Sequence, residues 1–389
     1  MESVHPRALN VASRVAAVVA TALLLFGIAV EGAAASSPTP SSLHRALAKI
    51  VEDRQGPPGV LMLVHRPGGD ELYRAGVADV RTEAPLRRSD HIRIASVAKT
   101  FNGAVALSLV ERGTLALDGT VGQGIPGLLP LADSVKLSEL LQHTGGVPEY
   151  IRTKAFGEEL NKDPGAYRSP PELLGFVRGE PLDFTPGSRY RYSDTDNIAA
   201  ALMAERASGL SYNQLLAELV YEPLGLRGTS LPRTVAMPRP FVHGYDVVPG
   251  KPPEDVSELI NPAGAWASGG IVSTPADLGR FIRAYVGGRL FGGAARRAQF
   301  SFWPGSSSPP GPGPNASGLS LFRYRTACGT VFGHTGSFPG YRLFAAADRT
   351  GRRSVVFVAN SQIVPGQGSK RVSDAMRIVQ RQAVCRALR

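Results

Sequence analysis

Hydrophobic positions follow two different periods along this chain, and the change of period divides it into regions. Between residues 43 and 51 apolar side chains recur at helical spacing, which predicts a short amphipathic helix. Residues 59–65 and 71–80 are strand-like, and the turn residues at 67–70 between them predict a hairpin. The N-terminal part of the mature chain therefore predicts one helix followed by two strands.

The middle and the end of the chain differ in the same way. Residues 96–300 show mostly helical patterning, broken by loops rich in Pro and Gly, and residues 306–318 form a Ser/Pro/Gly segment that we expect to be a surface loop. Strand-like runs then return at residues 331–334, 341–348 and 353–360. Apolar residues between 372 and 379 fall on one stripe and predict a closing helix.

Strands at both ends and helices between them favour an α/β fold of the α+β type. We expect one antiparallel sheet, built from residues of about 43–95 and 320–389 and flanked by the terminal helices. A mostly helical region of about 96–300 would be inserted into it, so that residues 43–389 form a single domain. The start of the inserted region would lie between sheet and helices, where pockets form.

The first 35 residues have the pattern of a secretory signal peptide. Arg7 and Arg14 precede an apolar run over residues 15–30, and small residues follow at Ala33–Ala35. A retained membrane anchor is the alternative, but the run is short for a spanning helix. We expect cleavage after Ala35, a flexible Ser/Pro leader over residues 36–42, a secreted protein and no stable membrane span after processing.

The chain is basic, with a net charge of +11. The charges of residues 1–35 cancel, so the exported protein keeps this charge, which favours anionic surfaces such as a cell wall. The Arg residues are dispersed, and no basic run is interleaved with aromatic residues. Nucleic acid is therefore not an expected partner.

Two cysteines, Cys328 and Cys385, are the only ones in the chain. In an exported protein such a pair predicts a disulfide, here closing a loop of about 60 residues and worth on the order of 4 kcal/mol. Their spacing fits no zinc motif, and histidines at ligand spacing are missing. We expect no metal and no cofactor.

Ser96 and Lys99 form the only Ser-x-x-Lys of the chain, at the head of an apolar helical run. Residues three apart lie on one helix face, so the amine would be within reach of the hydroxyl. The helix N-terminus favours developing negative charge. A weak nucleophile, a nearby base and such a helix end suit covalent acyl transfer. A capping serine followed by a solvated lysine is the alternative.

Two further segments carry candidate chemistry. Tyr192-Ser193-Asp194 lies after a Pro-Gly turn, and a phenol held near an ammonium can have a lowered pKa and carry protons. His334-Thr335-Gly336-Ser337 ends a strand-like run, where Gly allows close approach of a ligand. A second His-Thr-Gly, at residues 143–145, lies in a turn and is interpreted as loop architecture.

In this order, the three motifs resemble those of the serine penicillin-recognising enzymes. They are most similar to the secreted D-alanyl-D-alanine carboxypeptidases related to class C β-lactamases. Residues 142–148, 223–226 and 268–274 also match that family, as does a Cys-Gly pair shortly before His334 with a partner cysteine near the C-terminus. The resemblance spans nearly all of the mature chain and implies a β-lactamase/transpeptidase-like fold.

The resemblance also implies roles for individual residues. Ser96 would be the nucleophile, Lys99 would activate it and Tyr192 would pass the proton to the leaving amine. The N–H groups of Ser96 and Ser337 would bind the oxyanion. Substrate contacts are implied for Asp194, His334, Thr335, Gly336 and Ser337, and for Arg323 as a carboxylate-binding arginine.

The main departure from the family pattern is Asp194, where the family usually has Asn. Ionised Asp can only accept hydrogen bonds, and it could instead pair with Lys99 and hold it protonated. That would shift the role of base toward Tyr192. His334, in place of the β-lactamase lysine, argues against a dedicated β-lactamase.

The expected function is that of a serine DD-carboxypeptidase. It would remove the terminal D-Ala of peptidoglycan stem peptides through an acyl-enzyme, act as a monomer and be acylated by β-lactams. An esterase, a D-amino-acid amidase or a weak β-lactamase on the same fold is one alternative, favoured by Asp194. A non-catalytic penicillin-binding or wall-binding relative is the other.

Overall fold

A seven-stranded antiparallel sheet is the centre of the structure, a computed structural model that describes residues 39–304, 308–363 and 370–389. The expected signal peptide lies outside the described residues. In spatial order the strands are β2 (Gly69–Gly76), β1 (Gly59–Arg66), β11 (Ser354–Ala359), β10 (Tyr341–Ala347), β9 (Gly329–Phe338), β8 (Phe322–Thr326) and β7 (Asn315–Ser317).

The two ends of the chain meet inside this sheet. Strand β1 pairs with β11, so that Met62 lies opposite Phe357, and β1 continues into the predicted hairpin with β2. All six residues of β11 are buried, which fits its continuous apolar run. The expected antiparallel sheet built from both termini is confirmed.

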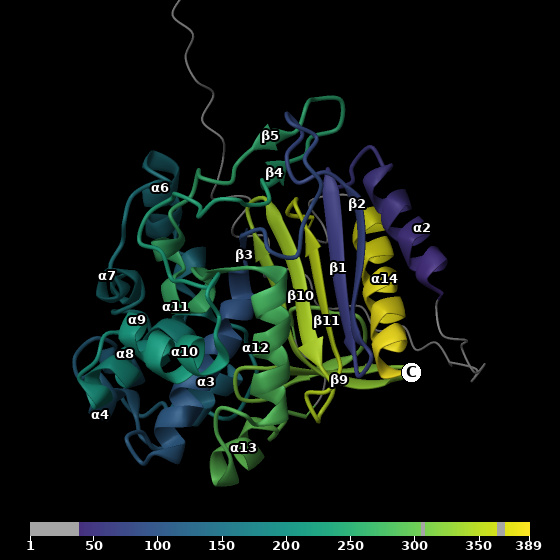
Figure 1. Cartoon of the computed structure of the whole chain (residues 1–389). Coiled ribbons are helices and arrows are strands. Elements are labelled where there is room, and N and C mark those ends of the chain that lie inside the picture. Colours follow the sequence, from purple (N-terminus) through teal and green to yellow (C-terminus); the bar gives the residue numbers. More distant parts are fainter. Residues whose placement is uncertain (1–38, 305–307, 364–369) are drawn as a thin grey trace, which may run out of the picture.

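Helices cover both faces of the sheet (Figure 1). Helices α2 (Pro40–Val51) and α14 (Lys370–Leu388) pack together on one face, and α12 (Pro275–Gly287) packs on β10 and β11 on the other. Apolar side chains form a separate core on each face. Both terminal helices were predicted from their apolar stripes.

The region between β2 and α12 is mainly helical, as expected, but it also contains short strands. Its helices are α3 (Ala98–Glu111), α4 (Val121–Gly124), α5 (Leu137–Gln142), α6 (Lys154–Lys162), α7 (Pro170–Gly175), α8 (Asp194–Ser208), α9 (Tyr212–Leu216), α10 (Glu222–Leu224) and α11 (Trp266–Gly269), and α13 (Gly293–Gln299) follows α12. Two small sheets pair β3 (Ile92–Arg93) with β6 (Val272–Ser273) and β4 (Tyr245–Asp246) with β5 (Glu254–Asp255).

Two local predictions are wrong. Helix α2 begins at Pro40 with Thr39 as its N-cap, so the last residues of the expected flexible leader are helical. The segment 306–318 was expected to be a surface loop, yet its described part contains the buried strand β7. Pairing of β7 with β8 satisfies backbone groups that composition alone assigns to solvent.

The predicted disulfide is confirmed. Cys328 and Cys385 are bonded, with their Cα atoms 5.1 Å apart. The bond joins the turn before β9 to helix α14, and so ties the sheet to the helix that covers it.

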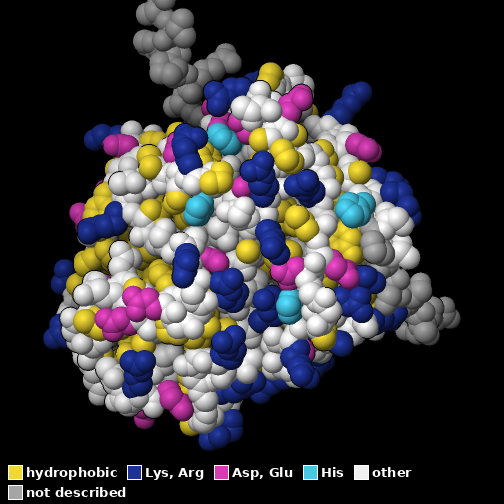
Figure 2. All heavy atoms as spheres, in the orientation of Figure 1, with side chains coloured by type: hydrophobic (Ala, Val, Ile, Leu, Met, Phe, Trp, Pro, Cys, Tyr) yellow, Lys and Arg dark blue, Asp and Glu magenta, His cyan; other side chains and the backbone are white. Residues whose placement is uncertain are grey.

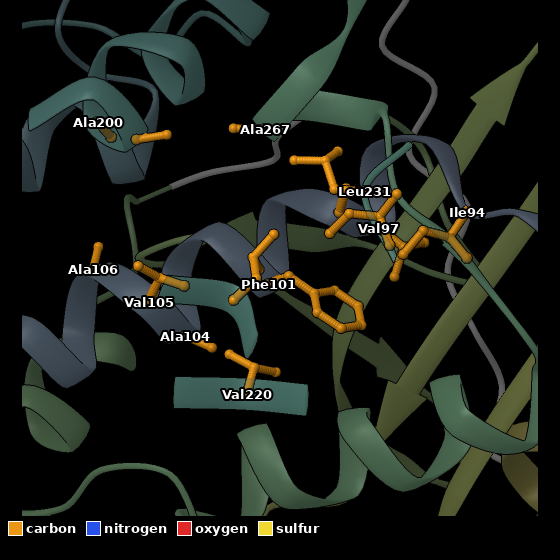
Figure 3. Packing of buried hydrophobic residues seen from close by; sticks show 14 of the residues in the cluster. Ile94, Val97, Phe101, Ala104, Val105, Ala106, Ala200, Val220, Leu231 and Ala267 are labelled. Atoms are coloured by element: carbon orange, nitrogen blue, oxygen red, sulfur yellow. The ribbon is translucent and has the colours of Figure 1, made fainter. Parts of the chain in front are cut away.

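Helix α3 lies between the sheet and the helical region and is buried from Ala98 to Leu109 (Figure 3). The ring of Phe101 stacks on that of Phe281, with centroids 3.6 Å apart. At Gly103 an added Cβ would stand 2.4 Å from the Cβ of Ser320, so the helix has no room for a larger residue there. The start of α3 is therefore held rigidly.

The surface bears its charge in a dispersed form. Figure 2 shows Lys and Arg side chains scattered over one face, with acidic side chains among them. Within the described residues, no helix is both long and apolar enough to cross a membrane.

Candidate active site

A tight turn presents Ser96 ahead of α3. Residues Ala95–Val97 form a 3-10 turn, and Ala95 has a φ of 49°, a left-handed conformation that is costly for a residue with a Cβ. Strand β9 comes very close here: a Cβ on Gly336 would lie 2.6 Å from the carbonyl oxygen of Ile94. Ser96 is therefore fixed between a helix start and the strand that carries the His-Thr-Gly motif.

The Lys99 amine lies at the centre of the site, with its side chain only 1% exposed. Its Nζ donates to Ser96 Oγ at 3.3 Å, to the carbonyl oxygen of Ser268 at 2.9 Å and to Oδ1 of Asp194. An ammonium has three donors and no acceptor, so these three acceptors match its charged form. The expected pairing of Asp194 with Lys99 is present.

A second carboxyl group, which the sequence did not point to, lies behind Asp194. The backbone N–H of Asp194, at the first residue of α8, donates to Glu149 Oε2 at 2.5 Å. Burial, and then the neighbouring charge of Asp194, raise the pKa of Glu149 to about 8. At neutral pH Glu149 is therefore mostly protonated, and Asp194 is the carboxyl group that contacts the Lys99 amine.

Tyr192 completes the group around Ser96. Its ring lies 4.8 Å from Lys99 Nζ, and its hydroxyl is buried without a hydrogen-bond partner among the described residues. The expectation of a lowered pKa is wrong: burial, and then the charge of Asp194, raise the pKa of Tyr192 well above its usual value. In this arrangement Tyr192 is a neutral phenol that can donate a proton.

His143, interpreted from the sequence as loop architecture, holds Tyr192 in place. The two residues next to Tyr192 in the chain are hydrogen-bonded to His143. The Arg191 N–H donates to the His143 carbonyl oxygen at 2.9 Å, and the Ser193 N–H donates to His143 Nδ1 at 3.3 Å. Its ring lies 4.5 Å from that of Tyr192. Burial lowers the pKa of His143 well below its usual value, so the ring is neutral. The repeated His-Thr-Gly was the only sequence signal for this role.

The His334 side chain is placed differently from the expectation. It is 1% exposed and packs against the ring of Phe322 at 4.9 Å and that of Tyr192 at 6.0 Å, so it does not face a substrate pocket. Burial, and then the charge of Lys99, lower its pKa to about 3, which keeps it neutral. Its Nδ1–H donates to the carbonyl oxygen of Thr335.

Arg323 is not brought to the site. Its guanidinium stacks on the ring of Phe302, 4.6 Å from the centroid, and it lines neither of the pockets beside Ser96. In the sheet it lies opposite Phe332, so it faces the other side of β9 from Thr335 and Ser337.

Two pockets meet at Ser96, and both also include Tyr192 and Ser337. The larger has a volume of about 90 Å³ and is mainly apolar. Its wall includes Asp194 and Ser268, which both accept hydrogen bonds from Lys99. Its apolar lining includes Tyr150, Ile151, Phe156, Leu160, Ile260 and Phe338. The smaller, of about 20 Å³, is bordered by Ser308, Pro309, Thr335, Gly336 and Arg342.

This arrangement suits acyl transfer. The acyl part of a substrate would fill one pocket and the leaving group the other, with its carbonyl carbon at Ser96 Oγ. Within residues 39–304, 308–363 and 370–389, no group of three or more His, Cys, Asp and Glu side chains is placed to hold a metal ion.

Known proteins share both this sequence pattern and this fold. The chain is 25% identical over 312 residues to penicillin-binding protein 4* of Bacillus subtilis, covering 76% of this chain and 66% of that protein. It is 34% identical over 181 residues to esterase EstB of Burkholderia gladioli, covering 43% and 46%. These matches span less than two thirds of the relatives' own length.

Two solved structures are matched over nearly the whole of their own length. A D-stereospecific amidohydrolase from Streptomyces sp. superposes with a TM-score of 0.76 at 28% identity, covering 88% of this chain and 99% of that one. A D-amino acid amidase from Ochrobactrum anthropi SV3, complexed with L-phenylalanine amide, gives 0.75 at 25% identity, covering 88% and 98%.

The family model described as beta-lactamase matches residues 44–375. With the Ser96–Lys99 pair at the head of a buried helix beside the His-Thr-Gly strand, this match shows that the chain belongs to the beta-lactamase family of serine hydrolases.

Proposed function

We propose that the protein is a serine DD-carboxypeptidase, which releases the terminal D-Ala of peptidoglycan stem peptides through an acyl-enzyme on Ser96. The observation that carries this is the pair of pockets at Ser96: an apolar one for the acyl side and a small one that ends on Thr335 and an arginine for the leaving group. The likeness to penicillin-binding protein 4* and to a putative D-alanyl-D-alanine carboxypeptidase of Escherichia coli supports it.

The resting site holds both candidate bases in their protonated forms, so the reaction needs a proton shift. Lys99 passes a proton to Asp194 along their existing hydrogen bond, which leaves a neutral amine and a neutral acid. The amine then takes the proton of Ser96 as Oγ forms a bond to the carbonyl carbon.

The remaining steps use the two N–H groups and the phenol. The carbonyl electrons move to an oxygen held by the N–H groups of Ser96 and Ser337. As this intermediate collapses and the C–N bond breaks, Tyr192 gives its proton to the leaving amine and is reprotonated by Lys99. A raised phenol pKa suits this donor role, since Tyr192 is protonated at every working pH. Water then attacks the acyl-enzyme, and the neutral Lys99 amine takes a proton from the water. As the ester bond to Ser96 Oγ breaks, Lys99 returns that proton to Ser96, and Asp194 then gives its proton back to Lys99.

The same proposal covers the setting in which the protein acts. We propose that it is secreted as a monomer, that its charge of +11 holds it near the anionic cell wall, and that β-lactams acylate Ser96 as slowly released substrate mimics.

The test is to incubate the mature protein with a diacyl-D-Ala-D-Ala peptide and with a fluorescent penicillin. We expect D-Ala release and one covalent label, both absent in Ser96→Ala. Labelling without D-Ala release would contradict the carboxypeptidase function and leave a penicillin-binding relative.

A D-amino-acid amidase is the second candidate, and Asp194 favours it. Its carboxylate lies on the wall of the apolar pocket, where it could accept hydrogen bonds from a free α-ammonium group beside an apolar side chain. Two D-specific amidohydrolases are among the proteins of similar structure. Faster turnover of D-Phe amide than of the N-acylated dipeptide would favour this candidate.

A further inference from the structure

A second cavity lies behind the wall of the apolar pocket. The segment 260–269 lines the apolar pocket through Ile260 and Ser268, and it lines the second cavity through Ala263 and Trp266. The second cavity has a volume of about 210 Å³, against about 90 Å³ for the apolar pocket. We propose that this cavity, with the groove that continues from it, binds an oligosaccharide of N-acetylated amino sugars. The inference rests on the proposed function only in taking the glycan strand of the cell wall as the source of that ligand.

The cavity continues into a longer groove. It lies among helices α7, α8, α9 and α11, on the side of the molecule away from α14 (Figure 1). Leu202, Glu205 and Ser211 line both the cavity and a more open hollow of about 550 Å³, which is bordered by Ile125 and Leu128. The cavity and this hollow together are called the outer groove below. Their continuity suits a chain of linked rings better than a single small molecule.

The walls of the outer groove do not suit a peptide backbone. Its lining residues belong to helices and to the loops between them, and none of them belongs to a strand. An extended peptide that binds through its main chain needs a free strand edge to pair with. A ligand of the outer groove must therefore be recognised through side chains.

Aromatic side chains of the cavity offer surfaces on which sugar rings could pack. The ring of Tyr212 lies 5.0 Å from that of Trp266. Tyr167 is 44% exposed at the mouth of the cavity. The Arg233 guanidinium lies 4.9 Å from the centre of the Tyr167 ring and donates to its hydroxyl at 2.9 Å, which fixes the ring. The C–H face of a pyranose is an apolar surface that suits such rings.

Glu205 supplies a carboxyl group with an open oxygen where the two parts of the outer groove meet. Its Oε1 accepts from the Tyr212 N–H at 2.6 Å, and no other hydrogen bond and no ion pair reaches this carboxyl group from the described residues. Burial raises the pKa of Glu205, as expected for a carboxyl group without a counter-ion. The side chains of Leu202 and Leu231 form a buried apolar floor beside it.

An acetamido group matches both of these features. Its N–H can donate to the open oxygen of Glu205, and its methyl group can cover the apolar floor. A sugar that carries only hydroxyl groups supplies the donors but not the methyl group. The outer groove therefore favours N-acetylated amino sugars over plain hexoses.

Trp266 links the outer groove to the active site. Its φ of 35° is a left-handed conformation that is costly for a residue with a Cβ, and such strain is found at ligand-binding positions. Trp266 begins α11, and the carbonyl oxygen of Ser268 in that helix accepts from Lys99 Nζ at 2.9 Å. A glycan strand in the outer groove would thus lie against the wall that separates it from the acyl pocket.

The experiment measures binding without catalysis. Trp266 and Trp303 are the two tryptophans of the chain, so Trp303→Phe leaves Trp266 as the reporter. This protein is titrated with chitotetraose, a β-1,4-linked tetramer of N-acetylglucosamine, and with cellotetraose, which lacks the acetamido groups. We expect a saturable change in Trp266 fluorescence with a Kd of about 1 mM or lower for chitotetraose. The Kd for cellotetraose should be at least about fivefold higher.

Two variants in the outer groove are compared with a matched control in the same background. Tyr167→Ala and Glu205→Gln should each raise the Kd for chitotetraose by about 3–10-fold. Glu205→Gln keeps the acceptor for the Tyr212 N–H but can place an amide NH₂ where the open oxygen was. Glu218→Gln changes an exposed carboxyl group that does not line the outer groove and should leave the Kd unchanged. Thermal unfolding checks that each variant is folded.

The outcomes separate this inference from the proposed function. No saturable change with chitotetraose, equal Kd values for the two sugars, or an unchanged Kd in both groove variants would overturn the outer groove as a glycan site. Saturation by a free stem peptide in place of chitotetraose would also overturn it. Binding as expected in a protein that releases no D-Ala would support the outer groove and overturn the carboxypeptidase function.

Discussion

The two pockets beside Ser96 are built from different parts of the chain and by different physics. The apolar pocket is lined mostly by loops and short helices of the inserted region, so its selectivity comes from shape and buried apolar area. Half of the residues that line the small pocket come from β9 and β10, and the one charged side chain among its lining residues, Arg342, is held there by the register of these strands. Substitutions in the apolar pocket should therefore change the preference for the size of the acyl group, and substitutions in the small pocket should change the preference for the charge of the leaving group.

Removing the nucleophile affects both pockets at once and should give the largest effect. Ser96→Ala should lower kcat by at least about 10⁴-fold on every substrate and abolish penicillin labelling, since no acyl-enzyme can form. Labelled intact mass measures the adduct, and thermal unfolding checks that the buried helix start is undisturbed. A labelled mutant would place the nucleophile at another serine.

Truncating a side chain that lines the apolar pocket should change how the acyl part of a substrate binds and leave the binding of the leaving group unchanged. Ile151→Ala removes apolar contact from a partly buried position and should lower kcat/KM by about tenfold for substrates with an aromatic acyl side chain. Acetylated substrates should be unaffected, and so should the preference for a leaving-group carboxylate. If Ile151→Ala changed the carboxylate preference, the two pockets would not be independent.

Changing Asp194 to Asn should alter the balance between amide and ester hydrolysis. Asn offers an N–H donor to a substrate carbonyl in the apolar pocket, which should raise kcat/KM for amides relative to esters by up to roughly tenfold. If the proton shift from Lys99 to Asp194 is required, both activities fall together. A matched ester and amide separate the two results, and an unchanged ratio would mean that Asp194 does not set substrate choice.

The local parts of this site could be predicted from the sequence, and the long-range parts could not. Ser96 and Lys99 face each other because a helix brings residues three apart together, and the strand β11 is visible in its unbroken apolar run. The role of His143 depends on Ser193 lying beside it, 50 residues along the chain.

Strand register explains the error over the arginine. Moving by one residue along a strand reverses the face to which a side chain points. The resemblance placed Arg323 only near the family's arginine, with a spacing that is slightly off, and the structure has Arg342, not Arg323, in the pocket. Burial explains the other surprise. Composition does not show which carboxyl or phenol is desolvated, and it is desolvation that sets the protonation of Glu149 and Tyr192.

The smallest effect at neutral pH is expected for Glu149→Gln, and it becomes visible only at alkaline pH. The pKa of Glu149 is raised to about 8 in the folded protein from an ordinary 4.5, so the group is protonated below pH 8 and acquires a charge above it. That second negative charge beside Asp194 would hold the proton of Lys99 more tightly. The wild type should therefore lose roughly tenfold in kcat/KM between pH 7 and pH 9. Glu149→Gln keeps the acceptor for the Asp194 N–H and cannot ionise, so its activity should stay level over that range.

Stability gives an independent check on the same group. Because the folded state holds a proton that the unfolded chain has lost, the contribution of Glu149 to the free energy of unfolding declines as the pH rises from 4.5 to 8. The melting temperature of the wild type should therefore fall over this interval relative to that of Glu149→Gln. If the melting temperatures of the wild type and of Glu149→Gln instead changed in parallel between pH 4.5 and pH 8, Glu149 would be ionised over that whole range. Asp194 would then lie beside a second carboxylate that is always charged, and the apolar pocket would be more strongly anionic than the small pocket. An anionic apolar pocket would favour binding of a free α-ammonium group, and so the amidase over the carboxypeptidase.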